Sequence, residues 1–371
     1  MNILQIRGEF SDNGPGSQCL TISIHLKEMG HKVYMMSGGG HLEKKIKQSN
    51  IPFIKIPEIS FESRNPINVV KAAIKIRKFL KEKDIEIVHG HNAAVVGICN
   101  MASIGLTRKI KFFQSCRGTE IRKFYGFRNW IYNIIKFNKI FAVSEYTKNT
   151  LMSFGVDSRK IEVTYNGTDL KRFNLKKLDS YRDEIRSQYS IPSDAFVIGI
   201  IGRMDGIKGH RDLIKVIDHL SKKHEKVYGF LVGDGSEYAS NVKLVKELNL
   251  ENRIIFTGLR LDSEKLHAAF DVFTLLSKKG YEMFPNVIIE AMTYGKPFLS
   301  VNTTGIPEMA KNGEGIICEC GDFESYCKGF ETLISNKTLR EKMGSNGRKS
   351  VESRFNISTV VNIILNSYIS S

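Results

Sequence analysis

The feature that most constrains the fold of this chain is an alternation of short β-rich apolar runs with longer amphipathic segments, repeated in both halves. Such alternation favours parallel sheets covered by helices, so we expect an α/β fold with a separate domain in each half. The expected strands are 2–6, 32–36, 53–56, 85–89, 111–114, 139–143 and 161–164 in the first half, and 196–201, 228–232, 253–256, 272–275, 297–300 and 315–318 in the second.

A polar and basic stretch from Asn166 to about Ser190 separates the two halves. With 371 residues the chain has the length of two domains. We expect an N-terminal domain over 1–175 and a C-terminal domain over 185–354. The last amphipathic stretch, within 355–371, is expected to cross back to the first domain.

The composition is that of a globular chain rather than a disordered or membrane-spanning one. Hydrophobic residues make up 42% of the sequence, and no apolar run approaches the roughly 20 residues of a transmembrane helix. The first residues are expected to form a strand and lack the pattern of a secretory signal, so we expect a cytoplasmic protein. The six cysteines show no paired spacing typical of zinc sites or disulfide scaffolds.

The positive charge is concentrated in the first half of the chain. Residues 1–170 hold 26 Lys and Arg against 14 Asp and Glu, a net charge of +12, whereas residues 171–371 hold 29 against 25, a net charge of +4. This asymmetry predicts that the first half meets an anionic partner.

Three loops of the second half follow expected strands, where parallel sheets bind ligands. The first contains Arg203 and Lys208, two cations five residues apart among glycines, which suits a diphosphate. Solvated surface charge is the competing interpretation. The second, with Gly233 and Gly235, permits a sharp turn and close backbone approach to a ligand.

The third loop leads into an expected helix, with Pro285 at its first position and Gly295 at its end. Glu282 would then lie in the loop above the sheet, and Glu290 inside the helix. The amides of a helix N-terminus attract anionic groups, and a carboxylate on the same helix can accept hydrogen bonds from a ribose diol. Alternatively, both glutamates are ordinary charges at the start and on the surface of a helix.

The spacing Glu282-x7-Glu290, followed by Ala291-Met292 and Gly295-Lys296-Pro297, resembles the signature of glycosyltransferase family 4. Further matching segments occur in the expected order over nearly the whole chain: 143–145, 165–169, 202–203 with 208–209, 233–235 and 304–308. The resemblance implies retaining enzymes of the GT-B fold, in which two Rossmann-like domains face each other across a cleft.

The resemblance also implies roles for individual residues of the second half. Arg203 and Lys208 match the pair that holds the nucleotide diphosphate, Glu290 matches the ribose ligand, and Glu282 matches the group that touches the donor sugar. The remaining donor-binding positions are Gly233, Phe284, Pro285, Asn286 and Val287. Because the sequence has no Asp-x-Asp pair, we expect no metal cofactor, with the cations neutralising the departing diphosphate instead.

The first half is expected to supply the acceptor side. Gly16 lies in a glycine-rich segment, 13–17, that matches a loop abutting the donor diphosphate, although Cys19 replaces the last glycine of a dinucleotide fingerprint. His91 ends an expected strand and is either a sugar or acceptor ligand or a structural histidine. Arg117 lies near a position where many relatives have histidine. For the retaining mechanism, both front-face attack and a covalent intermediate stay open.

These observations favour a retaining glycosyltransferase that moves a sugar from a nucleoside diphosphate sugar, UDP more than GDP, to a glycan or lipid-linked acceptor. Cell-surface polysaccharide or lipopolysaccharide assembly is the setting that the resemblance implies. A nucleotide-sugar epimerase on the same fold is the alternative enzyme. A nucleic-acid-binding protein is the weakest alternative, because the basic charge is not accompanied by a recognisable binding motif.

A basic and aromatic segment, 122–139, suggests a membrane contact. It combines five basic residues with six aromatic ones, including the single tryptophan, Trp130. Rings at the headgroup boundary and cations on anionic lipid are the chemistry of peripheral binding, although a buried helix packed on the sheet is an equal interpretation. We therefore expect peripheral, salt-sensitive binding to an anionic membrane surface at the inner face of the cell membrane.

Overall fold

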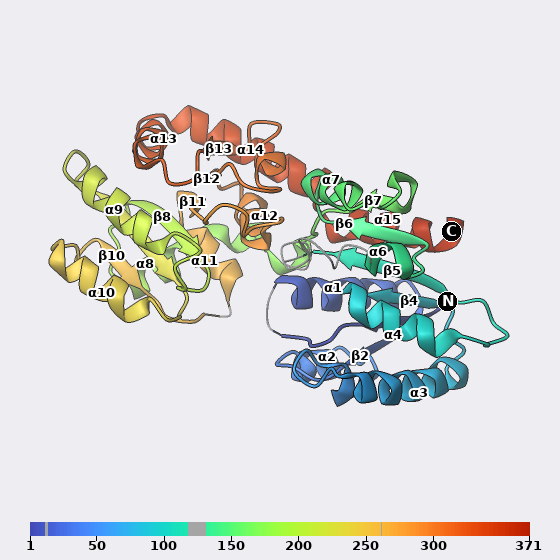
Figure 1. Ribbon diagram of the computed structural model, residues 1–371. Coiled ribbons are helices and arrows are strands. Elements are labelled where there is room, and N and C mark those ends of the chain that lie inside the picture. The colour runs from blue at the N-terminus through green and yellow to red at the C-terminus, as the bar shows by residue number, and fades with distance from the viewer. Residues whose placement is uncertain (12–13, 118–130, 261) are drawn as a thin grey trace. The chain divides into compact units, whose positions relative to one another are not determined.

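The computed structural model describes residues 1–11, 14–117, 131–260 and 262–371 (Figure 1). The chain divides into two compact units. Unit 1 contains Met1–Gly167 together with Ile357–Ser371, and unit 2 contains Thr168–Asn356. Each unit is built on its own parallel sheet with helices on both faces.

Unit 1 has a seven-stranded parallel sheet in the order β3-β2-β1-β4-β5-β6-β7. Its strands are β1 (Asn2–Ile6), β2 (Lys32–Ser37), β3 (Phe53–Lys55), β4 (Ile87–Gly90), β5 (Lys111–Cys116), β6 (Lys139–Ala142) and β7 (Ile161–Val163). All seven expected strands are confirmed, with ends shifted by at most two residues. The central strands are buried on both faces, which explains their continuous apolar runs.

The helices of unit 1 are α1 (Gly14–Glu28), α2 (Glu43–Gln48), α3 (Pro66–Glu82), α4 (Ala93–Ser103), α6 (Ile131–Ile134), α7 (Glu145–Ser153) and α15 (Ile357–Ser370), with short 3-10 turns at Pro57–Ile59 and Ser158–Lys160. On one face of the sheet, α3 and α4 bury aliphatic residues such as Ile76 and Val96. On the other face, α1 and α15 bury Leu26, Ile364 and Tyr368. The C-terminal helix therefore returns to the first unit, as expected.

Unit 2 has a six-stranded parallel sheet in the order β10-β9-β8-β11-β12-β13. The strands are β8 (Phe196–Ile201), β9 (Val227–Val232), β10 (Ile254–Phe256), β11 (Val272–Leu275), β12 (Phe298–Val301) and β13 (Gly315–Cys318). The helices are α8 (Leu178–Gln188), α9 (His210–Ser221), α10 (Tyr238–Glu247), α11 (Ser263–Ala269), α12 (Asn286–Thr293), α13 (Phe323–Ser335) and α14 (Lys337–Ser353), with 3-10 turns at Leu170–Arg172, Leu175–Lys177 and Pro307–Met309.

The expected domain boundary is displaced, because the basic stretch after Asn166 belongs to unit 2. Arg182 and Arg186 of α8 form ion pairs with Asp271, at N–O distances of 3.0 and 2.8 Å, just before β11. Phe173 packs edge-on against Tyr294, with ring centroids 5.4 Å apart. The segment expected as the end of the first domain and a linker is thus held by buried contacts of the second unit. The change of unit lies at Gly167, eight residues before the expected end.

In the part of the chain that the structure describes, no helix has both the length and the apolar character needed to cross a bilayer.

Candidate functional site

The strand order of unit 2 reverses direction between β8 and β11. From β8 the chain continues to β9 on one side of the sheet, whereas β11 lies on the other side of β8. The loops that leave the carboxyl ends of these two strands diverge at such a point and leave a crevice where open α/β sheets bind ligands. The loops that contain Lys208 and Glu282 both start here.

Lys208 and Glu282, 74 residues apart in sequence, form an ion pair at this point. The Nζ of Lys208 donates to Oε1 of Glu282, and the same oxygen accepts a hydrogen bond of 3.0 Å from Ser277 Oγ. The Glu282 side chain is 8% exposed and that of Lys208 is 23% exposed. The structure therefore brings together two of the site residues that the sequence analysis selected from separate motifs.

Arg203 lies in the same loop as Lys208 but faces solvent. Its side chain is 78% exposed, and it forms an ion pair of 3.0 Å with Asp205. The sequence predicted that the two cations converge, whereas Arg203 pairs with Asp205 and Lys208 with Glu282. An exposed guanidinium on a glycine-rich loop is free to turn toward an anion that binds there.

Two glycine-rich loops support this site by direct backbone contact. Gly233 has a φ of +133°, and a Cβ at this position would collide with the carbonyl oxygen of Gly202. The amide of Met204 donates to the carbonyl of Asp234 at 2.9 Å, and the amide of Glu237 donates to the carbonyl of Met204 at 2.8 Å. The loops after β8 and β9 are therefore held together at main-chain distance, which only glycine permits at position 233.

Helix α12 begins one residue later than expected, with Pro285 at the N-cap and Asn286 as the first helical residue. The first amides of a helix have no partner within the helix, so those of Asn286 and Val287 are available for an anion. Phe284 is buried and packs edge-on against Phe355, with centroids 5.4 Å apart. This packing fixes the loop that leads from Glu282 into the helix. Gly295, with a φ of +63°, follows the end of the helix as expected.

Glu290 lies in α12 and faces His267 of α11, with Oε2 and Nε2 3.5 Å apart. Burial raises the pKa of the Glu290 carboxyl, but the neighbouring His267 and Arg172 outweigh it and hold the pKa below the usual value. Glu290 is therefore an ionised acceptor at neutral pH. Sequence analysis missed both His267 and Ser277. No motif marks the histidine, whereas the position of Ser277 directly after β11 was a usable signal.

In unit 1 the strand order reverses between β1 and β4, and His91 follows β4. His91 is buried, its Nε2 donates to Gln5 Oε1 at 2.8 Å, and its Nδ1 has no partner among the described residues. Burial, together with the nearby His89 and Arg117, holds its pKa well below the usual value. Its ring stacks on that of His89, with centroids 4.7 Å apart. His91 is thus a neutral, oriented ring with an unused acceptor nitrogen.

Arg117 follows β5 and is buried. Its Nη1 donates to Oδ1 of Asn166, whereas Nε and Nη2 have no partner within the described parts of the chain. Burial lowers the pKa of this guanidinium to about 10, so it is still charged at neutral pH. A buried cation with unused donors is costly unless an anion or polar ligand meets it.

The glycine-rich segment of unit 1 is helical where the structure describes it. Helix α1 begins at Gly14, so Gly16 lies in its first turn rather than in a loop. Asn13 falls outside the described residues. Gln18 fixes this turn through two hydrogen bonds with the main chain of Gly167, 2.7 and 3.1 Å long.

Much of the basic and aromatic segment, 122–130 with Trp130, lies outside the described residues. Of its remaining aromatic residues, Tyr132 and Phe137 are buried in the core of unit 1. These two rings therefore support the interpretation of a packed helix and cannot lie in a headgroup layer.

A search of the described residues for metal sites finds no cluster of three or more His, Cys, Asp or Glu side chains that could hold an ion.

Comparisons with known proteins identify the family of the chain. The family model of the glycosyl transferases group 1 matches residues 181–350, and that of Glycosyltransferase Family 4 matches residues 13–172. N-acetyl-alpha-D-glucosaminyl L-malate synthase of Bacillus anthracis is 26% identical over 360 residues, covering 95% of this chain and 92% of the relative. The capsular polysaccharide biosynthesis glycosyltransferase CapM of Staphylococcus aureus is 28% identical over 314 residues, covering 77% of each chain.

Among solved structures, HepE of Anabaena in complex with UDP aligns over 100% of both chains with a TM-score of 0.86 and 20% identity. This similarity confirms the expected GT-B fold of two Rossmann-like sheets. The two family models match one unit each and together leave few residues uncovered. The protein belongs to family 4 of the glycosyltransferases, the group 1 enzymes, which have the GT-B fold and transfer sugars with retention of configuration.

Proposed function

We propose that the protein transfers a sugar from a UDP-sugar, with the donor bound by the loops that follow β8, β9 and β11 in unit 2. The observation that carries the proposal is the Lys208–Glu282 ion pair at the point where the strand order reverses. The UDP complex of HepE, a protein of the same fold, supports a uridine nucleotide as the donor.

The diphosphate of the donor would meet three kinds of positive group in these loops. Lys208 supplies a half-buried ammonium, Arg203 an exposed guanidinium, and α12 the amides of Asn286 and Val287 at its N-terminus. Gly233 allows the main chain to approach the phosphates without a Cβ in the way. Charge that develops on the leaving diphosphate is then stabilised by Lys208 and the helix amides, which are already in place.

The ribose and the sugar would be bound by the two glutamates. Glu290 is an ionised acceptor positioned by His267, which suits the two hydroxyls of a ribose. Glu282 uses Oε1 for Lys208 and Ser277, and its other oxygen, Oε2, makes no hydrogen bond to any described residue. That oxygen is the one we assign to a sugar hydroxyl. In this proposal Glu282 has two roles: Oε1 positions Lys208, and Oε2 contacts the donor sugar.

Unit 1 would supply His91 and Arg117 to the acceptor side of the reaction and Gly16 to the donor diphosphate. His91 offers a neutral acceptor nitrogen, Nδ1, that suits a sugar hydroxyl. Arg117 offers two unused donors that suit a phosphate or a hydroxyl. Gly16, in the first turn of α1, is the residue that the family resemblance assigns to the donor diphosphate. The roles of His91 and Arg117 account for buried polar atoms that have no partner among the described residues.

The acceptor we propose is a glycan or a lipid-linked glycan of a cell-surface polysaccharide, at the inner face of an anionic membrane. The capsular polysaccharide enzyme CapM and the +12 charge of residues 1–170 support this setting. The Bacillus anthracis relative, whose name gives an L-malate product, represents the contrasting case of a small acceptor.

The experiment is a screen of UDP- and GDP-sugars for thermal stabilisation of the protein and for donor hydrolysis, with and without EDTA. We expect a UDP-sugar to stabilise the protein and to be hydrolysed at equal rates in EDTA, because Lys208, Arg203 and the helix amides replace a metal ion. Loss of turnover in EDTA, restored by manganese or magnesium, would contradict the metal-independent site. Stabilisation by GDP-sugars alone would contradict the assignment of a UDP-sugar as the donor.

A further inference from the structure

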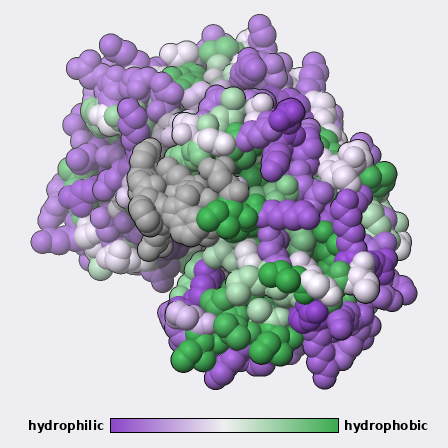
Figure 2. Space-filling view, turned by 45° about the vertical axis from the view of Figure 1, so that its right-hand side comes forward, coloured by the Kyte–Doolittle hydropathy of each residue, from purple (hydrophilic) through white to green (hydrophobic). Residues whose placement is uncertain are grey.

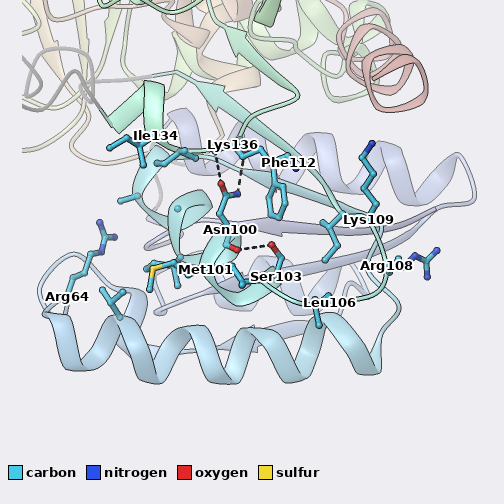
Figure 3. Close-up of a pocket in the computed structure, with 17 residues that line it drawn as sticks. Arg64, Asn100, Met101, Ser103, Leu106, Arg108, Lys109, Phe112, Ile134 and Lys136 are labelled. Atoms are coloured by element: carbon cyan, nitrogen blue, oxygen red, sulfur yellow. Dashed lines mark hydrogen bonds between the residues drawn. The ribbon is translucent and has the colours of Figure 1, made fainter.

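Unit 1 contains an apolar pocket of about 740 Å³ that the transfer reaction does not use. It runs along α4 from Ala94 to Ile104, between α3 and the start of β5 (Figure 3). Asn100 forms part of one wall. Its side chain accepts a hydrogen bond of 2.7 Å from the amide of Lys136, which connects α4 to the segment after α6. This volume lies in the range of pockets that enclose a small molecule or a chain of similar bulk.

The pocket combines an apolar interior with a cationic rim. Its walls include Val69, Gly97, Ile98, Met101, Ile104 and Phe112, and its described lining contains no acidic side chain. Figure 3 shows Arg64 at one end and Arg108 with Lys109 at the other. Within the described residues, Lys109 and Lys136 form no ion pair. Two unpaired cations beside an apolar cavity match a ligand with a hydrocarbon chain and an anionic head.

The neighbouring face of α3 continues the same pattern. Ile67, Val70 and Ile74 are exposed at helical spacing, and Lys71 and Lys78 lie on the same side of the helix. Figure 2 shows hydrophobic residues among hydrophilic ones at the bottom of the view, where α3 lies in Figure 1. An exposed apolar stripe flanked by lysines is typical of a helix that lies in a membrane interface.

We propose that this pocket binds one acyl chain of an anionic phospholipid, with Lys109 and Lys136 on its phosphate, while the exposed stripe of α3 rests on the bilayer. The inference rests on the proposed action at an anionic membrane and names the residues that make the contact. It includes Lys136 of the basic and aromatic segment 122–139, whose residues 122–130 lie outside the described part of the chain. The absence of acidic lining favours an anionic lipid over a zwitterionic one.

The apolar part of the proposal is tested by Ile104→Asp. Ile104 is 73% exposed at the mouth of the pocket, so the substitution leaves the core intact. Leu259→Asp in unit 2 is the matched control, because Leu259 is also 73% exposed and gains the same charge. Co-sedimentation with vesicles of phosphatidylglycerol and phosphatidylcholine at low salt is the measurement. We expect at least a ten-fold loss of the partition coefficient for Ile104→Asp and less than a two-fold change for Leu259→Asp.

The cationic rim is tested by Lys109→Gln/Lys136→Gln, with Lys246→Gln/Lys342→Gln as a control that removes two exposed, unpaired charges from unit 2. About 1 kcal/mol per lysine at a membrane surface corresponds to about five-fold in binding, so the rim variant should lose about 25-fold. The control should lose much less. Equal losses in the two double variants would show that net charge alone drives binding and would overturn the site.

A soluble short-chain lipid separates the pocket from the surface. Dihexanoyl-phosphatidylglycerol, titrated below its micellar concentration, should bind the wild type and not Ile104→Asp, whereas glycerol phosphate should bind neither. Binding of glycerol phosphate as tightly as the lipid would mean an anion site without a chain and would overturn the proposal. If the wild type fails to bind vesicles at all, the membrane setting itself is wrong. If it binds but both site variants bind equally well, only the pocket is wrong.

Discussion

The Lys208–Glu282 ion pair provides a way to separate what a residue contributes to stability from what it contributes to transfer. Lys208→Met removes the ammonium and leaves the carboxylate of Glu282, 8% exposed, with Ser277 as its only described partner. Breaking a buried pair from one side costs about 3 kcal/mol. For a unit of this size, that corresponds to a fall of about 6–12 °C in the melting temperature.

The double variant Lys208→Met/Glu282→Gln removes both charges together. The amide of glutamine still accepts the hydrogen bond from Ser277, so no buried charge is left without a partner. Replacing both members of a buried pair by neutral groups is far less costly than removing one. We expect the double variant to lie about 2 kcal/mol above Lys208→Met in free energy of unfolding, a coupling that a double-mutant cycle measures directly.

Transfer should respond differently from stability. Each variant lacks the cation that stabilises the leaving diphosphate, which costs about 100- to 1000-fold in kcat. The double variant should therefore recover stability but not turnover. The assays are urea denaturation followed by circular dichroism and transfer from the UDP-sugar at saturation. Strictly additive losses of stability would show that the two side chains are not coupled, and recovery of turnover in the double variant would refute the role of Lys208.

Two further predictions concern titrating groups. Glu290→Gln removes the ionised acceptor beside His267 and should weaken UDP binding about ten-fold in calorimetry, since a hydrogen bond to a charged group contributes about 1.5 kcal/mol; an unchanged affinity would remove Glu290 from the ribose site. Burial lowers the pKa of His89 to about 3 from its ordinary value of 6.5, so the unfolded chain binds more protons between these two values and stability falls as the pH drops below 6.5. His89 alone should lower the free energy of unfolding by about 2 kcal/mol between pH 8 and pH 5, and a urea midpoint that is constant over this range would contradict its burial.

The strands and the fold were predictable from the sequence, because a parallel sheet buried on both faces requires short continuous apolar runs. Every expected strand is present, and the crossing of the last helix to unit 1 was visible in its apolar pattern. The domain boundary was not predictable in the same way. The charged residues of α8 suggested a solvated linker, yet Arg182 and Arg186 are held by Asp271, a partner 85 or more residues away in sequence.

The candidate site residues were chosen from motif spacing, which did not predict the contacts between their side chains. Motif spacing indicated Lys208 and Glu282, which lie in loops that follow strands, and Glu290, which lies in helix α12. The local sequence did not indicate that Lys208 pairs with Glu282, or that His267 faces Glu290. Both contacts join residues from separate segments, so they depend on which strands become neighbours in the sheet. The lipid pocket was missed for the same reason, as its lining comes from three separate segments.

The central claim, that the loops of unit 2 bind the diphosphate of the donor, is tested most directly by titrating UDP and uridine into the wild type and Arg203→Ala. Arg203 is 78% exposed, so its removal leaves the fold unchanged and any loss is a loss of binding. We predict that UDP binds Arg203→Ala at least ten-fold more weakly than the wild type, whereas uridine, which has no phosphate, binds both proteins equally. Equal UDP affinities for the two proteins would contradict the claim.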